Sequence, residues 1–114
     1  MGKIIAFTNQ KGGVGKTTSA INVATSLAVS ELKTLMIDLD PQANATTGLS
    51  DLFEKNKSNI YNVLIEKESI LSSIIKTKLN FLDVVTSTND LVGAEIELVS
   101  MIGREYRLNE CLLD

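Results

Sequence analysis

The chain has 114 residues, with 11 lysine and arginine residues against 14 aspartate and glutamate residues, no histidine and a single cysteine. Without histidine, these residues can build neither a Ser–His–Asp or Cys–His nucleophile system nor a histidine-containing zinc site, which excludes the usual hydrolases and zinc enzymes. The formal net charge of −3 gives no overall basic field for nucleic acid, and one cysteine cannot form an intramolecular disulfide, so we expect a small domain, or part of one, in a reducing cytoplasm.

The first third of the chain predicts a strand, a helix and a second strand. Residues 3–7 are β-branched and mostly apolar, which is typical of a buried strand. Residues 17–29 place their apolar side chains on one helical face, with serine and threonine opposite. Residues 34–37 form a second apolar run, which ends before Pro41. This order predicts a βαβ unit, and hence an α/β fold with a mainly parallel sheet flanked by helices.

The remaining residues predict shorter elements. Residues 42–59 are polar and indicate a loop with short helical pieces, and residues 60–75 indicate one or two short helices. Residues 81–85 predict a third strand, after which residues 88–90 offer an N-cap for a helix, and a last helix is expected over residues 106–113. No apolar run approaches the roughly 18 residues that span a bilayer, so we expect no membrane segment.

A glycine-rich segment connects the first predicted strand to the first predicted helix. Its glycines allow positive φ and let backbone N–H groups turn inward around a phosphate, while the helix directs its partial positive charge at the same point. Lys16 would reach the β- and γ-phosphate oxygens, and the Thr17 hydroxyl would coordinate Mg²⁺. The residues expected to bind the nucleotide are Lys11, Gly12, Gly13, Val14, Gly15, Lys16, Thr17 and Thr18.

Two carboxylates follow the second predicted strand. Asp38 and Asp40 are two residues apart, so in an extended chain their side chains point to the same face. Ligands of parallel α/β sheets bind at the carboxyl ends of the strands. The pattern therefore favours carboxylates that face Mg²⁺ and an attacking water. The alternative, acidic residues that merely end a strand, would be preferred if the glycine-rich segment were absent.

These motifs resemble those of the ParA/MinD superfamily of dimeric ATPases. The strict G-x-x-x-x-G-K-[ST] pattern fails at Gln10, and K-G-G-V-G-K-T matches the superfamily's deviant P-loop instead. D-L-D-P-Q-A-N-A-T over residues 38–46 is similar to a segment of ParA/Soj-type chromosome and plasmid partitioning ATPases. In that segment Ala43 replaces the commoner glycine, so a positive φ there would be strained. Residues 82–87 and 91–98 resemble further family segments.

The resemblance implies an ATP-binding and ATP-hydrolysing segment with ATP and Mg²⁺ as cofactors. Lys11, Lys16 and Asp40 would be the catalytic residues. Of these, Lys11 would reach across an ATP-dependent homodimer to the partner's nucleotide, and Asp40 would position or activate the hydrolytic water. Asp38 would help to hold Mg²⁺ through water, and Asn44 would belong to a nucleotide-responsive switch. For the complete protein the resemblance implies a ParB-like stimulator, non-specific DNA binding through the missing C-terminal half, no membrane attachment and a cytoplasmic, nucleoid-associated location.

The resemblance also implies that residues 1–114 are the N-terminal part of a single P-loop ATPase domain, ending before the Walker B strand. In the family fold that strand and a later one flank the first strand, so both neighbours of residues 3–7 would be absent. Because unmet backbone groups in a buried strand cost about 1–3 kcal/mol each, we expect the first strand either to pair directly with the second or to pair with another copy. We also expect weak nucleotide binding with little or no turnover.

Two alternatives stay open. The chain could be a non-catalytic nucleotide-binding or oligomerisation module, or a MinD-like positioning ATPase, against which the Asp-Pro-Gln sequence after the second strand argues. The residues do not distinguish a chromosome from a plasmid as the cargo.

Overall fold

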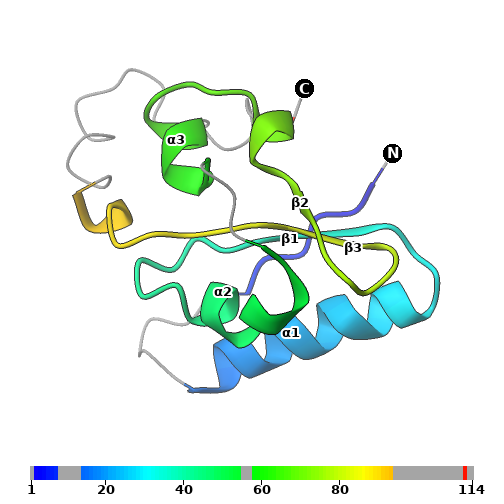
Figure 1. Ribbon diagram of the computed structural model, residues 1–114. Helices are drawn as coiled ribbons and strands as arrows, with labels where there is room; N and C mark the ends of the chain where they lie inside the picture. The colour runs from blue at the N-terminus through cyan, green and yellow to red at the C-terminus, as the bar shows by residue number, and fades with distance from the viewer. Residues whose placement is uncertain (1, 8–13, 55–57, 94–111, 113–114) are drawn as a thin grey trace.

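The computed structural model describes residues 2–7, 14–54, 58–93 and 112. A three-stranded sheet lies between helices on its two sides, with α1 and α2 below it and α3 above it in Figure 1. The helices are α1 (Val14–Val29), α2 (Asn44–Gly48) and α3 (Ile60–Leu64), and the 3₁₀ helices are η1 (Ser50–Leu52) and η2 (Ile70–Ser73). The strands are β1 (Thr34–Ile37), β2 (Ile75–Lys76) and β3 (Leu82–Val85).

The sheet has the strand order β1-β3-β2. β1 and β3 are parallel, with Thr34 opposite Leu82 and Ile37 opposite Val85, while β2 is antiparallel to β3. The Asp38 amide continues the ladder by donating to the Val85 carbonyl at 3.1 Å. The predicted second and third strands are therefore confirmed, and so is the α/β class with a mainly parallel pairing. The short strand β2 falls at the end of a segment for which only helices were predicted.

The helices also follow the predicted pattern. α1 begins at Val14, before the expected start, and buries Ala24 and Ala28 on its predicted apolar face. At the end of α2, a Cβ added to Gly48 would lie 2.9 Å from the Ile21 Cδ1 atom of α1. A larger side chain would therefore require the Ile21 side chain to move, and glycine lets α2 lie directly on α1.

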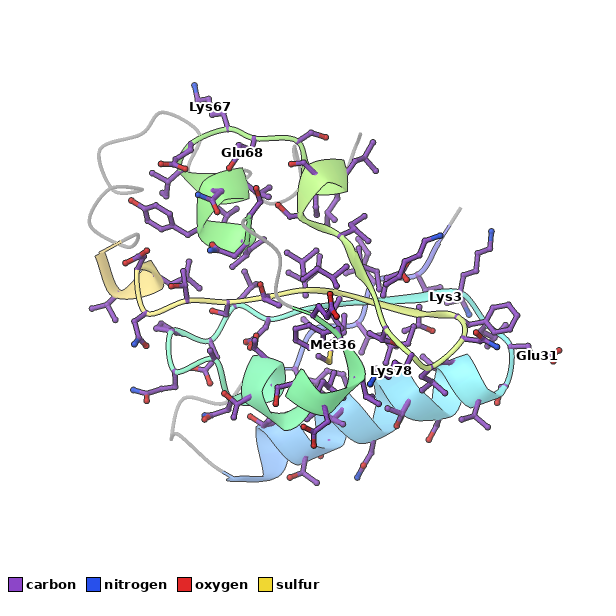
Figure 2. All side chains as sticks on the ribbon, in the orientation of Figure 1. Lys3, Glu31, Met36, Lys67, Glu68 and Lys78 are labelled. Carbon is purple, nitrogen blue, oxygen red and sulfur yellow. The ribbon has the colours of Figure 1, made fainter. Side chains whose placement is uncertain are left out.

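Two groups of buried apolar side chains hold these layers together. Leu82, Val84 and Met36 belong to the group between the sheet and α1 and α2, and Figure 2 shows the Met36 side chain on that side of β1. Val85 belongs to the other group, with Ile60 and other residues of the α3 side. Because successive strand residues point to opposite faces, Val84 and Val85 pack on different sides of the sheet. No helix of the described residues is long and apolar enough to cross a membrane.

Residues 2–7 form no strand, which corrects the prediction of a buried strand over residues 3–7. Ile4 is 78% exposed and Ile5 62% exposed. The expected direct pairing of the first and second strands is also wrong, because residues 2–7 form no ladder with β1, which among the described residues pairs with β3. An apolar, β-branched sequence becomes a strand only where it pairs with a neighbour and packs on it, and among the described residues no strand pairs with residues 2–7. Pairing with another copy of the chain stays a prediction.

Other predictions fall on residues that the structure leaves out. The helix after residues 88–90 begins as predicted, with residues 91–93 helical, and the rest of it lies outside the described residues. The glycine turn before α1 also lies outside them. Of the predicted last helix, Leu112 alone is described, and it is helical.

The expected strain at Ala43 is confirmed. Ala43 is the N-cap of α2 and adopts the left-handed conformation, with φ 55° and ψ 37°. Its amide donates to the Asp40 carbonyl at 2.8 Å, and its carbonyl accepts from the Thr47 amide at 2.9 Å. The turn after β1 and the first helical bond of α2 therefore both require this conformation, which costs an L-residue about 1–2 kcal/mol.

Replacing Ala43 with glycine is predicted to stabilise the fold. Glycine removes the left-handed strain of about 1–2 kcal/mol from the folded state. It also raises the conformational entropy of the unfolded chain, which lowers stability by about 0.4–1 kcal/mol, so the free energy of unfolding should rise by about 0.5–1 kcal/mol. Urea denaturation measures the change. The matched control is Ala20→Gly in α1, which should lower the free energy of unfolding by about 1 kcal/mol. Equal losses in both variants would contradict the prediction.

A second prediction concerns the exposed N-terminal segment. The double substitution Ile4→Thr and Ile5→Thr should change the free energy of unfolding by less than about 0.5 kcal/mol, because neither side chain is buried. The same change at the fully buried Ile60 should cost more than about 2 kcal/mol. Both are measured by denaturant unfolding at low protein concentration. A double variant as unstable as Ile60→Thr would show that residues 2–7 are buried after all.

Candidate functional site

The candidate site lies at one edge of the sheet. Figure 1 shows the carboxyl ends of β1 and β3 at the left of the view, the same side on which α1 begins. The crossover between two parallel strands produces this arrangement, because it returns the chain to the edge at which β1 started. Loops that leave β1 and β3 therefore meet there, on the side of the sheet where α1 begins. This is the edge at which open α/β sheets bind ligands.

The second half of the glycine-rich segment forms the first turn of α1, which starts at Val14. Lys16 lies in this turn, followed by Thr17, which is half-buried, and Thr18, which is exposed. The turn holds no acidic side chain. The first N–H groups of an α-helix have no partner within the helix, and its dipole adds a partial positive charge, so this end of α1 is suited to an anion. Lys11, Gly12 and Gly13 lie outside the described residues.

Asp38 directly follows β1 and is 5% exposed. Its Oδ1 atom accepts from the Asp40 amide at 2.9 Å. Its Oδ2 atom accepts from the Thr46 amide at 2.9 Å and from the Thr46 hydroxyl at 2.6 Å. Three donors compensate the burial of this carboxylate. Two carboxylate oxygens offer about four acceptor positions, so the donors among the described residues leave one position on Oδ1 for a further donor such as a metal-bound water.

Asp40 is half-buried and organises its own loop. Its Oδ1 atom accepts from the Gln42 amide at 3.0 Å, and its Oδ2 atom accepts from the Asn44 side-chain amide at 3.0 Å. The structure thus brings Asn44 to Asp40, two residues that the sequence placed in one functional segment. With respect to the part of the chain that the structure describes, each Asp40 oxygen keeps one acceptor position free, which suits a carboxylate that has to hold a water molecule.

Thr46 and Ser87 also belong to the site, although the sequence did not predict them as site residues. The Ser87 amide donates to the Thr46 hydroxyl oxygen at 3.0 Å, and the Ser87 hydroxyl donates to the Asp40 carbonyl at 2.6 Å. Ser87 is 41 residues from Thr46 and 47 from Asp40 along the chain. No spacing rule signals such a contact, because it arises only once β1 and β3 lie side by side.

The carboxylates cannot make a metal site alone. Across residues 2–7, 14–54, 58–93 and 112, no group of three or more acidic, cysteine or histidine side chains could hold a metal ion. Mg²⁺ is bound in many proteins by only one or two side chains, together with phosphate oxygens and water. The donors present, a threonine hydroxyl in the first turn of α1 and two partly engaged carboxylates, therefore fit a cation that arrives with a phosphorylated ligand.

Comparison with known proteins identifies relatives along almost the whole chain. A family model described as an AAA domain, AAA_31, matches residues 2–114. The chain is 48% identical over 112 residues to the chromosome partitioning protein ParA of Myxococcus xanthus, covering 98% of this chain and 40% of that protein. It is 46% identical over 112 residues to the sporulation initiation inhibitor protein Soj of Bacillus subtilis, covering 98% and 44%. The chain thus spans less than half the length of these curated relatives.

Solved structures agree with these relatives. A plasmid partition protein from Borrelia burgdorferi matches with a TM-score of 0.81 and 34% identity, covering 93% of this chain and 47% of that chain. The cobyrinic acid a,c-diamide synthase of Mycobacterium smegmatis, solved with bound ADP and magnesium, matches with a TM-score of 0.83 and 32% identity, covering 93% and 43%. The predicted P-loop NTPase fold is therefore confirmed, and the chain belongs to the AAA_31 family as a homologue of the ParA/Soj partitioning ATPases.

Proposed function

We propose that this chain binds ATP with Mg²⁺ through residues 11–18 and that the complete protein hydrolyses ATP as a DNA-partitioning ATPase. The observation that carries the proposal is that α1 begins on the same side of the sheet as the carboxyl end of β1, which Asp38 and Asp40 follow in the chain. Relatives named as partitioning proteins, and the bound ADP and magnesium of a related synthase, support it.

Each site residue has a proposed task. Lys16 binds the β- and γ-phosphates, and the Thr17 hydroxyl is a Mg²⁺ ligand. Asp38 accepts from a Mg²⁺-bound water through the free position on Oδ1, while Asp40 orients the attacking water with the acceptor positions that Gln42 and Asn44 leave open. Mg²⁺, when bound, neutralises charge on the phosphates.

The wider activity belongs to the complete protein. There Lys11 acts across a nucleotide-dependent homodimer, much as an arginine finger acts in trans. The dimer binds DNA non-specifically in the cytoplasm at the nucleoid, and a ParB-like partner stimulates hydrolysis. For the 114 residues alone, the proposal is weak nucleotide binding with little or no turnover, since they correspond to less than half the length of the curated relatives.

A binding experiment tests the nucleotide site. Titration calorimetry should detect MgATP binding to the chain, and Lys16→Gln should weaken it about 10- to 100-fold, because a charge-assisted phosphate contact contributes about 1.5–3 kcal/mol. The matched control is Lys67→Gln. Lys67 is exposed and lies on the α3 side, away from α1 (Figure 2), so its loss should leave the affinity within about twofold. Equal weakening by both changes would indicate non-specific charge attraction and overturn the assignment.

Hydrolysis tests the role of Asp40. In a form that extends beyond residue 114, Asp40→Asn should lower kcat about 100-fold or more while MgATP affinity stays within about threefold, because the lost carboxylate orients water and does not hold the nucleotide. Phosphate release measures kcat. The 114-residue chain should release phosphate at a small fraction of the rate of the longer form. A comparable rate that Lys16→Gln abolishes would show that these residues suffice for catalysis, and would contradict the proposed poor turnover.

A further inference from the structure

Two hydroxyl groups connect the end of β3 to both aspartates of the site. The Thr46 hydroxyl donates to Asp38 Oδ2 at 2.6 Å and accepts from the Ser87 amide at 3.0 Å. The Ser87 hydroxyl donates to the Asp40 carbonyl at 2.6 Å. We name this set of four residues, Asp38, Asp40, Thr46 and Ser87, the hydroxyl clamp. Because the Thr46 hydroxyl carries one proton, donating it to Asp38 leaves its oxygen to accept from Ser87, so both bonds form at once.

The clamp lies largely out of solvent. Asp38 is 5% exposed and Ser87 8% exposed, and Thr46 is half-buried. Hydrogen bonds to an ionised carboxylate are shorter and stronger than neutral ones, and a buried carboxylate that loses a donor is left poorly compensated. Removing the Thr46 hydroxyl therefore takes away one donor from Asp38 and one acceptor from Ser87. Asp38 and Ser87 then each lose one hydrogen bond, which a water molecule or a movement of the loop has to replace.

The clamp also fixes where Asp40 lies. The Asp40 carboxylate bonds to Gln42 and Asn44, which belong to the same loop and so move with it. Among the described hydrogen bonds, those that tie Asp40 to the ends of the strands are the bond from its amide to Asp38 and the bond from Ser87 to its carbonyl. The clamp therefore ties Asp40 to the ends of β1 and β3.

The strand end that carries the clamp is held from the other side of the sheet as well. The Ile60 amide, at the start of α3, donates to the Thr86 carbonyl at 2.9 Å. Ile60 is fully buried in the α3 side of the core. The backbone just before Ser87 is therefore held in place by α3, so Ser87 can hold the loop after β1 in a fixed position.

We propose that Thr46 and Ser87 are positioning residues that hold the loop from Asp38 to Thr46 against the end of β3, and thereby set the Asp40 carboxylate for hydrolysis. Neither hydroxyl needs to touch the nucleotide for this purpose. The catalytic part of the proposal rests on the proposed function, while the holding of the loop can be tested without any nucleotide.

The test compares Thr46→Val, which keeps the shape and loses the hydroxyl, with Thr46→Ser, which keeps the hydroxyl. In the nucleotide-free chain, amide hydrogen exchange by NMR should show protection of the Thr46 and Ser87 amides falling at least tenfold in Thr46→Val and returning in Thr46→Ser. The matched control is Thr25→Val, which removes a half-buried hydroxyl that donates to the Ile21 carbonyl within α1. It should leave both amides protected.

In a longer form that hydrolyses ATP, Thr46→Val and Ser87→Ala should each lower kcat about tenfold or more with KM within about threefold, and Thr46→Ser should restore kcat. A merely structural role would instead lower kcat in Thr25→Val to the same degree.

Unchanged protection in Thr46→Val would overturn the clamp, and lost protection with unchanged kcat would overturn its positioning role. Failure of the wild type to bind MgATP would refute the proposed function, and the exchange measurement would then decide alone whether the clamp holds the loop.

Discussion

The parallel pairing of β1 with β3 is the contact on which the rest of the described structure depends. It brings the segments after the two strands to the same edge, although Asp40 and Ser87 are 47 residues apart in the chain. It also divides the core, because alternate residues of β3 pack on α1 and α2 or on the α3 side. Without this pairing, the Asp38 carboxylate would lose its position at the end of the ladder, and the loop after β1 would have no strand end to bind to.

Local sequence patterns predicted those parts of the fold that depend on local physics. The apolar face of α1 and the apolar runs of β1 and β3 are visible in the sequence because helix and strand periodicity follow from backbone geometry. The strain at Ala43 could also be foreseen, since a motif that usually contains glycine indicates a position with positive φ.

The sequence failed where a structure depends on a distant partner. Residues 3–7 have the composition of a buried strand, yet in the described structure Ile4 and Ile5 are exposed, because burial of a strand requires neighbours on both sides and not β-propensity alone. The contact between Thr46 and Ser87 was not predicted for the same reason. It depends on the register of two parallel strands, which no single segment encodes. Asp38 and Asp40 were found because their spacing is local, whereas the residues that hold them were not.

The loop after β1 balances strain against hydrogen bonds. Ala43 costs about 1–2 kcal/mol in its left-handed conformation, and charge-assisted bonds such as those from Thr46 to Asp38 contribute about 1.5–3 kcal/mol each. Asp38 accepts three such bonds, which together outweigh the strain and hold the loop in the described conformation. Under the proposed function, a bound phosphate would add negative charge on the side of the sheet that already carries two carboxylates, and Mg²⁺ and Lys16 would offset this repulsion. Mg²⁺ should therefore strengthen the binding of ATP at this site. The loop that carries Asp40 is the segment whose conformation we expect to respond to both ligands.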